Sequence, residues 1–209
     1  MILYGYYRST ASYRVRIALG LKGLAWTDKP INLLEGDQRS AAFRQVNPQG
    51  RVPVLELASG ERLFQSSAIL EYLDACYPSP PLLEGTPVQQ ARARAVASLI
   101  GSDIHPLHNA AVLAALRQQG LDESRVGQWI GRWIGEGLAA VEAMIDASEG
   151  YCFGARPGLA DLYLVPQAYA AERFQVPLDA CPKVRAVIAQ AKAHPAFSAA
   201  HPAKQPDAP

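Results

Sequence analysis

Apolar residues in the first part of the chain follow two alternating spacings, one typical of short strands and one typical of helices. Lys22-Gly23 closes the first helical stretch as a helix C-terminus would, and Ser59-Gly60 has the composition of a tight turn. The βαβ, helical turn, ββ, α order predicts a thioredoxin-like α/β domain over residues 1–80, with a parallel strand pair and an antiparallel hairpin. The predicted elements are a strand over 2–7, a helix over 15–21, a strand over 26–34, a short helix over 40–46, strands over 52–57 and 62–64, and a helix over 66–77.

Strand signals end at a proline-rich linker, Pro78-Ser79-Pro80-Pro81. Beyond it, Thr86-Pro87-Val88-Gln89 has the form of a capping box with proline at the first helical position, and it predicts a long helix. Pro106 must kink or interrupt that helix, because proline removes one backbone donor. We therefore expect an all-α domain over residues 81–209. Apolar residues at helical spacing predict its further helices over 126–145, from 158 onward and over 182–193.

The composition indicates a folded chain and argues against nucleic acid as its main partner. The 209 residues are 49% hydrophobic and 19% charged, with a formal net charge of +1. A disordered chain would be less apolar or more charged, and a nucleic-acid-binding protein would usually carry a basic stripe. No apolar run approaches the roughly 20 residues of a membrane-spanning helix, and Met1–Tyr7 lacks the basic start and cleavage site of a signal peptide. We expect a cytoplasmic protein of one or two domains.

Three widely spaced cysteines, Cys76, Cys152 and Cys181, form no C-x-x-C motif. The sequence therefore offers neither a dithiol redox centre nor a zinc knuckle. We expect three reduced thiols that are buried or half-buried. Any sulfur chemistry would then use a sulfur that arrives with a ligand.

His105 and His108 have a spacing that can bind a metal on a helix. Asp103 is the only further ligand nearby, so we expect no metal and interpret the histidines as substrate-binding or packing residues. Trp129 and Trp133 lie at helical spacing and are expected in the core.

The loop Arg8-Ser9-Thr10-Ala11-Ser12 stands between a predicted strand and a predicted helix. Its hydroxyls can cap the helix, and the free N–H groups and partial positive charge of a helix start would stabilise a thiolate placed there. Plain N-capping by Ser9 or Ser12 is the alternative interpretation.

Two further positions suit a ligand: one can pair with an extended peptide, and the other suits a carboxylate. If the Val52-Pro53 bond is cis, the backbone before it turns outward and can pair with such a ligand, whereas an ordinary trans proline would only begin a strand. Gln65-Ser66 opens a helix, where exposed N–H groups and a hydroxyl suit a carboxylate. A simple helix cap is the alternative at that position.

Taken together, these motifs resemble the cytosolic glutathione transferases, and more narrowly the zeta class, over residues 2–206. The resemblance implies a thioredoxin-like first domain, a helical second domain and a homodimer. It also implies glutathione-dependent cis–trans isomerisation of maleylacetoacetate, a dicarboxylic enone, in the breakdown of tyrosine and phenylalanine. The segments that carry it are 7–19, Asn47-Pro48, Val52-Pro53, Gln65-Ser66, 103–107, Ala160-Asp161-Leu162, 164–167 and Glu172-Arg173-Phe174.

The resemblance also implies a role for each site residue. Ser9 would hold the glutathione thiolate as the catalytic hydroxyl, and Arg8, His105 and Arg173 would face the second substrate, the two arginines binding its carboxylates. Spacing places His105 and Asn109 one helical turn apart, on one face. The residues expected to bind glutathione are Ser9, Thr10, Ala11, Ser12, Gln38, Val52, Gln65, Ser66 and Asn109.

Some positions depart from the class. Ala11 stands where the class usually has cysteine, and Thr10 replaces a serine. Isomerisation should survive these changes, because its nucleophile is the glutathione sulfur. Ala110-Ala111 occupies a place where some relatives that act on maleylpyruvate carry arginine, which favours maleylacetoacetate. The alternatives are a zeta-like transferase that acts on maleylpyruvate, haloacids or other electrophiles, and a non-catalytic interaction module of the same fold.

Overall fold

A four-stranded mixed sheet organises the first of two structural units in the computed structural model, which describes residues 1–209. This unit comprises Met1–Pro81 together with His194–Pro209, and the second comprises Leu82–Ala193. The sequence-based division placed residues 194–209 with the helical domain. The structure differs because this last segment packs on the first unit.

The sheet has the strand order β2-β1-β3-β4. β1 (Ile2–Gly5) runs parallel to β2 (Thr27–Pro30) and antiparallel to β3 (Val54–Glu56), which forms a hairpin with β4 (Arg62–Phe64). This topology confirms the predicted α/β class. β2 is much shorter than the expected strand over 26–34. After Pro30 the chain turns at Asn32, whose side-chain oxygen accepts from the Leu34 and Glu35 amides.

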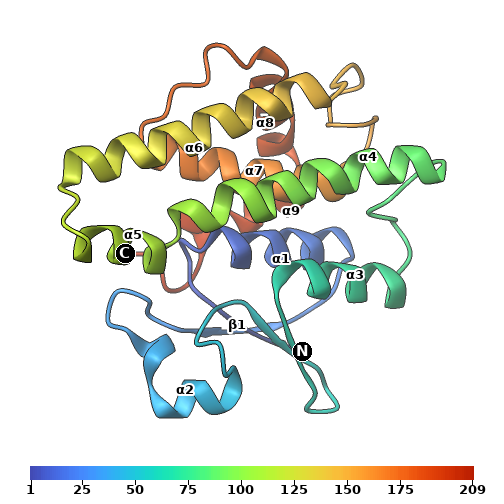
Figure 1. The fold of residues 1–209 in the computed structure, drawn as a ribbon. Helices are drawn as coiled ribbons and strands as arrows, with labels where there is room; N and C mark the ends of the chain where they lie inside the picture. The colour runs from blue at the N-terminus through green and yellow to red at the C-terminus, as the bar shows by residue number, and fades with distance from the viewer. The chain divides into compact units, whose positions relative to one another are not determined.

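Helices cover both faces of this sheet (Figure 1). α1 (Thr10–Leu21) and α3 (Ser66–Cys76) lie side by side on one face, and α2 (Ala41–Val46) covers the other. Because successive strand residues point to opposite faces, Tyr4 and Val54 reach Phe43 of α2, and the alternate residues Leu3 and Leu55 are directed to the opposite face.

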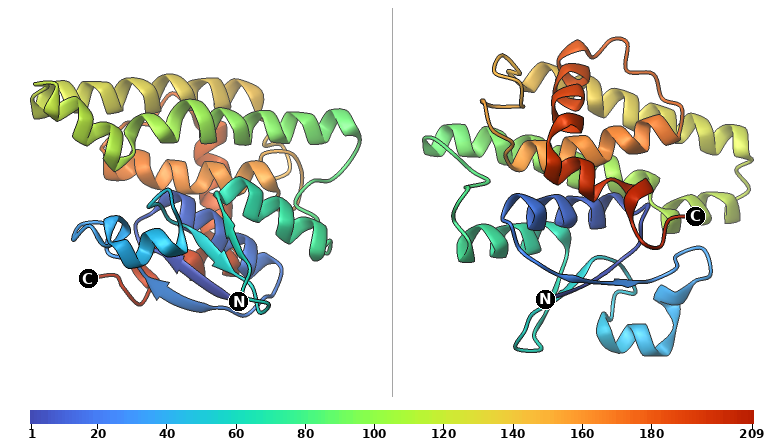
Figure 2. Two further views of the ribbon diagram at one scale, coloured as in Figure 1. Left: turned by 60° about the horizontal axis from the view of Figure 1, so that its bottom comes forward. Right: turned by 180° about the vertical axis from the view of Figure 1, so that it is seen from behind.

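A short helix that the sequence did not predict, α9 (Pro195–Ala200), packs against α1, as Figure 2 shows from behind. The two helices approach closely at Gly20, where an added Cβ would lie 3.2 Å from the Ala196 Cβ. A 3₁₀ turn, η4 (Pro202–Lys204), follows. The C-terminal segment is therefore part of the unit that holds the sheet.

The second unit is entirely helical. Its first helix, α4 (Pro87–Ser98), has the predicted capping box at Thr86. The predicted interruption near Pro106 takes the form of a π-helical turn, η2 (Leu99–Ile104), and a 3₁₀ turn, η3 (His105–His108). None of the helices of the chain is both long and apolar enough to cross a bilayer. The remaining helices are α5 (Ala110–Gln118), α6 (Glu123–Met144), α7 (Leu159–Arg173) and α8 (Pro182–Ala193).

Almost all residues of α7 are buried, and a buried carboxylate fixes its start. Asp161 accepts hydrogen bonds from the Gly158 amide at 2.8 Å and the Cys152 amide at 2.9 Å. Burial raises the pKa of Asp161, and the two backbone bonds oppose that rise. Burial also raises the pKa of the Cys152 thiol. The expectation of three buried or half-buried thiols is wrong for Cys76, which is exposed.

Candidate functional site

The loop between β1 and α1 presents a hydroxyl at a helix start. Ser9 is the N-cap of α1, and its Oγ accepts from the Ser12 amide at 3.2 Å. The amides of Thr10 and Ala11 have no hydrogen-bond partner in the chain. A hydroxyl has one donor and two acceptor positions, so the cap leaves the Ser9 O–H group available to donate. Capping and thiolate binding, the two interpretations of this loop, are therefore compatible.

The neighbouring hydroxyls face inward. The side chains of Thr10 and Ser12 are buried, and their oxygens make no hydrogen bond within the chain. The Ser12 Oγ lies against the backbone of Gly5 in β1, 3.4 Å from where a Cβ would stand. The first turn of α1 is thus packed against the sheet, and its N–H groups without a partner are those of Thr10 and Ala11.

The second predicted position is at the start of β3. The Val52–Pro53 peptide bond is cis. The backbone N–H and C=O groups of Val52 make no hydrogen bond in the chain, and β3 pairing begins only at Val54. The side chain of Asn47 holds the loop before it, donating to the Arg51 carbonyl at 2.7 Å. Val52 therefore presents a free donor and acceptor from a braced loop.

Gln38 lies beside the same loop. Gly50, at a φ of +61°, passes so close to it that an added Cβ would be 2.7 Å from the Gln38 carbonyl oxygen. The Gln38 side-chain NH₂ group donates to the Leu33 carbonyl at 3.5 Å. The Gln38 side-chain oxygen, Oε1, is buried without a hydrogen bond. A buried, unpaired acceptor of this kind suits an N–H donor from a ligand.

The start of α3 is open. Gln65 occupies the N-cap position at a φ of +65° and makes no side-chain cap, so the alternative of a simple helix cap is wrong here. The Gln65 side-chain NH₂ group donates instead to the Gln49 side-chain oxygen at 2.8 Å. The Ser66 Oγ accepts from Arg14 at 3.3 Å. The free amides at this helix start, with the Ser66 hydroxyl, form a position that favours an anion.

Arg8 supplies the positive charge next to Ser9. Its guanidinium carbon lies 5.9 Å from the ring centroids of both Tyr6 and Tyr7, and it forms no ion pair in the chain. Burial and a hydrogen bond with Tyr7 raise the pKa of Tyr6 to about 12. Because Tyr6 stays protonated at neutral pH, it does not neutralise Arg8.

In the second unit the prediction that His105 and Asn109 share one helix face is wrong. His105 belongs to η3, whereas Asn109 is extended and caps α5. The Asn109 side-chain oxygen accepts from the Ala111 and Val112 amides at 3.0 and 3.1 Å. This cap starts a new helix at Ala110, so the helical spacing between the two residues is lost. The Asn109 oxygen is committed to the cap, and only its NH₂ group remains for a ligand.

A series of ring contacts links His105 to Arg173. The His105 and His108 rings lie 5.5 Å apart, His108 is 5.6 Å from Phe174, and the Arg173 guanidinium carbon is 4.2 Å from the Phe174 centroid. His108 is buried, with Nε2 3.2 Å from the Gln167 side-chain oxygen. His108 is thus a packing residue, and Arg173, at the end of α7, stays exposed. The structure contains no group of three or more side chains able to hold a metal.

Within the first unit, residues that the sequence analysis did not single out connect the predicted ones. Arg14 ties α1 to α3 through Ser66, and Gln49 ties the loop before Val52 to Gln65. Arg14 is almost completely buried. Two arginines among the apolar residues around the start of the predicted helix, Arg14 and Arg16, were the available signal, since charged residues are buried only with partners. Gln49 carried no signal in the sequence.

Comparisons with known proteins agree with this geometry. Residues 8–76 match the family described as "Glutathione S-transferase, N-terminal domain". A maleylacetoacetate isomerase of Pseudomonas aeruginosa is 61% identical over 211 residues, covering 100% of this chain and 99% of the relative. A maleylpyruvate isomerase structure, described as a bacterial zeta-class glutathione transferase, superposes with a TM-score of 0.97 at 42% identity, with both chains fully covered. A maleylacetoacetate isomerase of Methylobacterium extorquens AM1, solved with malonate and glutathione, gives a TM-score of 0.94 at 36% identity over both full chains.

Proposed function

The chain belongs to the maleylacetoacetate isomerase family of zeta-class glutathione transferases, and from this premise we propose that it isomerises maleylacetoacetate to fumarylacetoacetate with glutathione as cofactor. The observation that carries the proposal is the start of α1. There a Ser9 hydroxyl with a free hydrogen stands beside two unpaired backbone amides. Together they form a cradle for a negatively charged sulfur.

The residues of the first unit fit glutathione along its length. Val52 offers a backbone donor and acceptor to the middle of the tripeptide, and Gln38 offers a buried acceptor. The amides at the start of α3, with Gln65 and Ser66, bind the carboxylate of the γ-glutamyl end. In this proposal the first unit is the glutathione-binding domain and the second unit supplies substrate contacts.

Bound glutathione supplies the nucleophilic sulfur whose reversible addition makes the conjugated double bond of the substrate free to rotate. Ser9 donates to that sulfur and, with the Thr10 and Ala11 amides, lowers the pKa of its thiol. Arg8 and Arg173 bind the carboxylates of the substrate, which also stabilises the negative charge that develops on the enone. His105 and the NH₂ group of Asn109 are further contacts to substrate and cofactor.

Maleylpyruvate is the second candidate substrate, because the maleylpyruvate isomerase structure superposes so closely. The first turn of α5 argues for maleylacetoacetate instead. Ala110 and Ala111 are exposed there and offer no cation for an additional carboxylate contact. The identity of 61% with a maleylacetoacetate isomerase favours the same choice.

Family membership also supports two further parts of the proposal, a cytoplasmic location and a homodimer. Light scattering of the purified protein at assay concentration measures the mass directly. A mass of twice the chain is expected, and the mass of one chain would contradict the dimer.

An ultraviolet assay with each substrate, with and without glutathione, tests the function. We expect turnover of maleylacetoacetate only when glutathione is present, faster than turnover of maleylpyruvate, and with total free thiol unchanged at the end. Consumption of one thiol per product would instead indicate a conjugating transferase. Absence of glutathione binding in titration calorimetry would indicate a non-catalytic module.

A further inference from the structure

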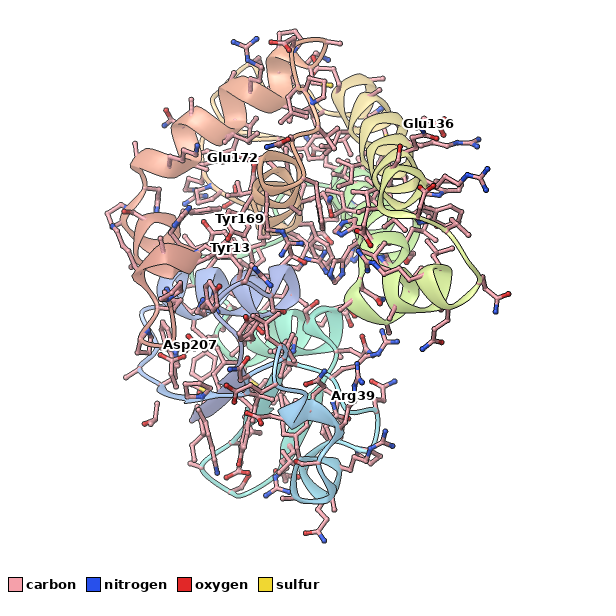
Figure 3. All side chains as sticks on the ribbon, turned by 90° about the vertical axis from the view of Figure 1, so that its left-hand side faces the viewer. Tyr13, Arg39, Glu136, Tyr169, Glu172 and Asp207 are labelled. Carbon is pink, nitrogen blue, oxygen red and sulfur yellow. The ribbon has the colours of Figure 1, made fainter.

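A carboxylate from the far end of the chain holds the loop that carries Ser9. The backbone amide of Tyr7 donates to the Asp207 Oδ2 at 2.8 Å, a contact across 200 positions of sequence. Figure 3 labels Asp207 on the C-terminal stretch beside α1, the helix that carries Tyr13. Tyr7 is two residues before Ser9, so this bond acts on the loop itself rather than on the sheet below it.

A buried guanidinium fixes the same loop from within the unit. Arg16 donates to the Tyr7 carbonyl at 2.9 Å and approaches the Tyr6 carbonyl at 3.5 Å. Its Nε donates to the Ala200 carbonyl at 3.1 Å, at the end of α9. Arg16 therefore connects the loop and the C-terminal segment, and Asp207 makes a second connection between the same two segments.

The C-terminal segment is itself well anchored. Gln205 is almost completely buried, and its NH₂ group donates to the Ala199 and His201 carbonyls, both at 2.9 Å. Lys204 donates to the Ser198 hydroxyl at 2.6 Å. These bonds set the backbone from which Asp207 reaches Tyr7, so its carboxylate is positioned by the segment rather than by chance at the surface.

Only two residues, Arg8 and Ser9, separate Tyr7, which Asp207 and Arg16 hold, from the start of α1. The Ser9 amide donates to the Tyr6 carbonyl at 3.0 Å, the same carbonyl that Arg16 approaches. A change in the peptide planes of Tyr6 and Tyr7 therefore passes directly to Ser9 and to the first amides of α1. Catalytic hydrogen bonds depend on geometry within about 0.5 Å, so such a change has chemical consequences.

We propose that Asp207 is a positioning residue for Ser9: by accepting the Tyr7 amide hydrogen bond it sets the orientation in which the Ser9 hydroxyl and the free amides of α1 stabilise the glutathione thiolate. This inference deepens the proposed function and rests on its glutathione site. The effect requires an acceptor oxygen at the position of Asp207 Oδ2, and it does not require the negative charge. Asparagine keeps an oxygen there, alanine removes it, and glutamate keeps the charge but displaces the oxygen.

The test compares D207A, D207N and D207E with the unchanged chain, and with D179A as the control. Asp179 is an exposed acid between α7 and α8, in the other unit. The pKa of the bound glutathione thiol is measured from the ultraviolet absorbance of the thiolate in the binary complex, without any second substrate. Amide hydrogen exchange of the ligand-free protein, measured at Tyr7, shows whether the bond itself is lost.

We expect D207A to speed exchange at Tyr7 and to raise the thiol pKa by about one unit, a tenfold loss of thiolate below that pKa. D207N and D179A should keep both values of the unchanged chain, and D207E should shift both partially. If D207A does not fold, D207E is compared with D207N instead, and the proposal then requires a higher thiol pKa in D207E than in D207N. Faster exchange without a change in thiol pKa would overturn the proposal, since the bond would then be merely structural. An equal shift in D207N and D207A would also overturn it, because the charge would then be responsible.

The measurement is independent of the substrate. A protein that binds glutathione with these pKa values but does not turn over maleylacetoacetate would contradict the proposed function and leave the role of Asp207 intact.

Discussion

Replacing Ser9 by alanine should cause two separable losses, because the Ser9 oxygen has two roles. The Oγ accepts the Ser12 amide at 3.2 Å and caps α1, and loss of such a cap costs about 1 kcal/mol of stability. The O–H group is the donor proposed for the glutathione thiolate. A hydrogen bond to a charged group contributes about 1.5–3 kcal/mol, which corresponds to a rise of about 1–2 units in the thiol pKa.

Ser40 offers a matched control for the first loss. It is the N-cap of α2, and its Oγ accepts the Phe43 amide at 3.1 Å. Ser40→Ala and Ser9→Ala should therefore lower the free energy of unfolding, measured with urea, by similar amounts of about 1 kcal/mol. Only Ser9→Ala should change the pH dependence of kcat/KM.

The pH profile of kcat/KM separates the two roles. The rate rises with pH as the bound thiol ionises, so a higher thiol pKa moves this limb to higher pH. Ser9→Ala should shift it by about 1–2 units and reduce kcat/KM about 10–100-fold at pH values below it. Ser9→Thr, which keeps the hydroxyl, should retain the original limb. An unchanged profile in Ser9→Ala, or an equal shift in Ser40→Ala, would refute the role of Ser9.

The other predictions concern the supports of the site. Gly50→Ala should lower the free energy of unfolding by about 1–3 kcal/mol and weaken glutathione binding in calorimetry, since its Cβ would collide with the Gln38 backbone carbonyl. The control Gly60→Ala, with open space around it, should lower stability alone, and equal glutathione affinities of the two variants would contradict this prediction. Arg173→Ala should raise the KM for dicarboxylic substrates far more than the KM for glutathione, and equal effects would remove its role. Asp161→Ala leaves two backbone amides without an acceptor and should lower the free energy of unfolding by about 3 kcal/mol, with Asp161→Asn intermediate in urea denaturation.

Local sequence signals predicted those helix ends that are set by a capping residue or by a proline. Thr86 was identified as a cap because Pro87 and Gln89 complete the capping box, and the structure forms it. The break at Pro106 followed from its missing donor. The strand over 26–34 was overextended because apolar residues continue after Pro30, and only pairing with β1 determines where a strand exists. α9 was missed because its six residues are too few to show a helical period.

The prediction of the site was limited by side-chain hydrogen bonds that the sequence analysis did not anticipate. Asn109 was placed on a helix face with His105 by spacing alone, although asparagine before an apolar run is itself a cap signal. That signal could have separated the two residues. The bond from Tyr7 to Asp207 had no such signal, because nothing local relates residues 200 positions apart. Positions fixed by neighbours in sequence were thus predictable, and positions fixed by distant partners were not.

The two buried arginines of α1 explain why this helix organises the site. Side chains two residues apart lie about 200° apart around a helix, so Arg14 and Arg16 leave α1 in nearly opposite directions. Arg14 reaches Ser66 at the start of α3, and Arg16 reaches the carbonyls before Ser9 and the end of α9. A single cation could hold only one of these sides. With both, α1 holds its own start, the start of α3 and the loop before Ser9, the three segments of the proposed glutathione site, in one fixed geometry. In the proposed function, the thiolate and the carboxylate of glutathione are then bound without reorganisation of these segments.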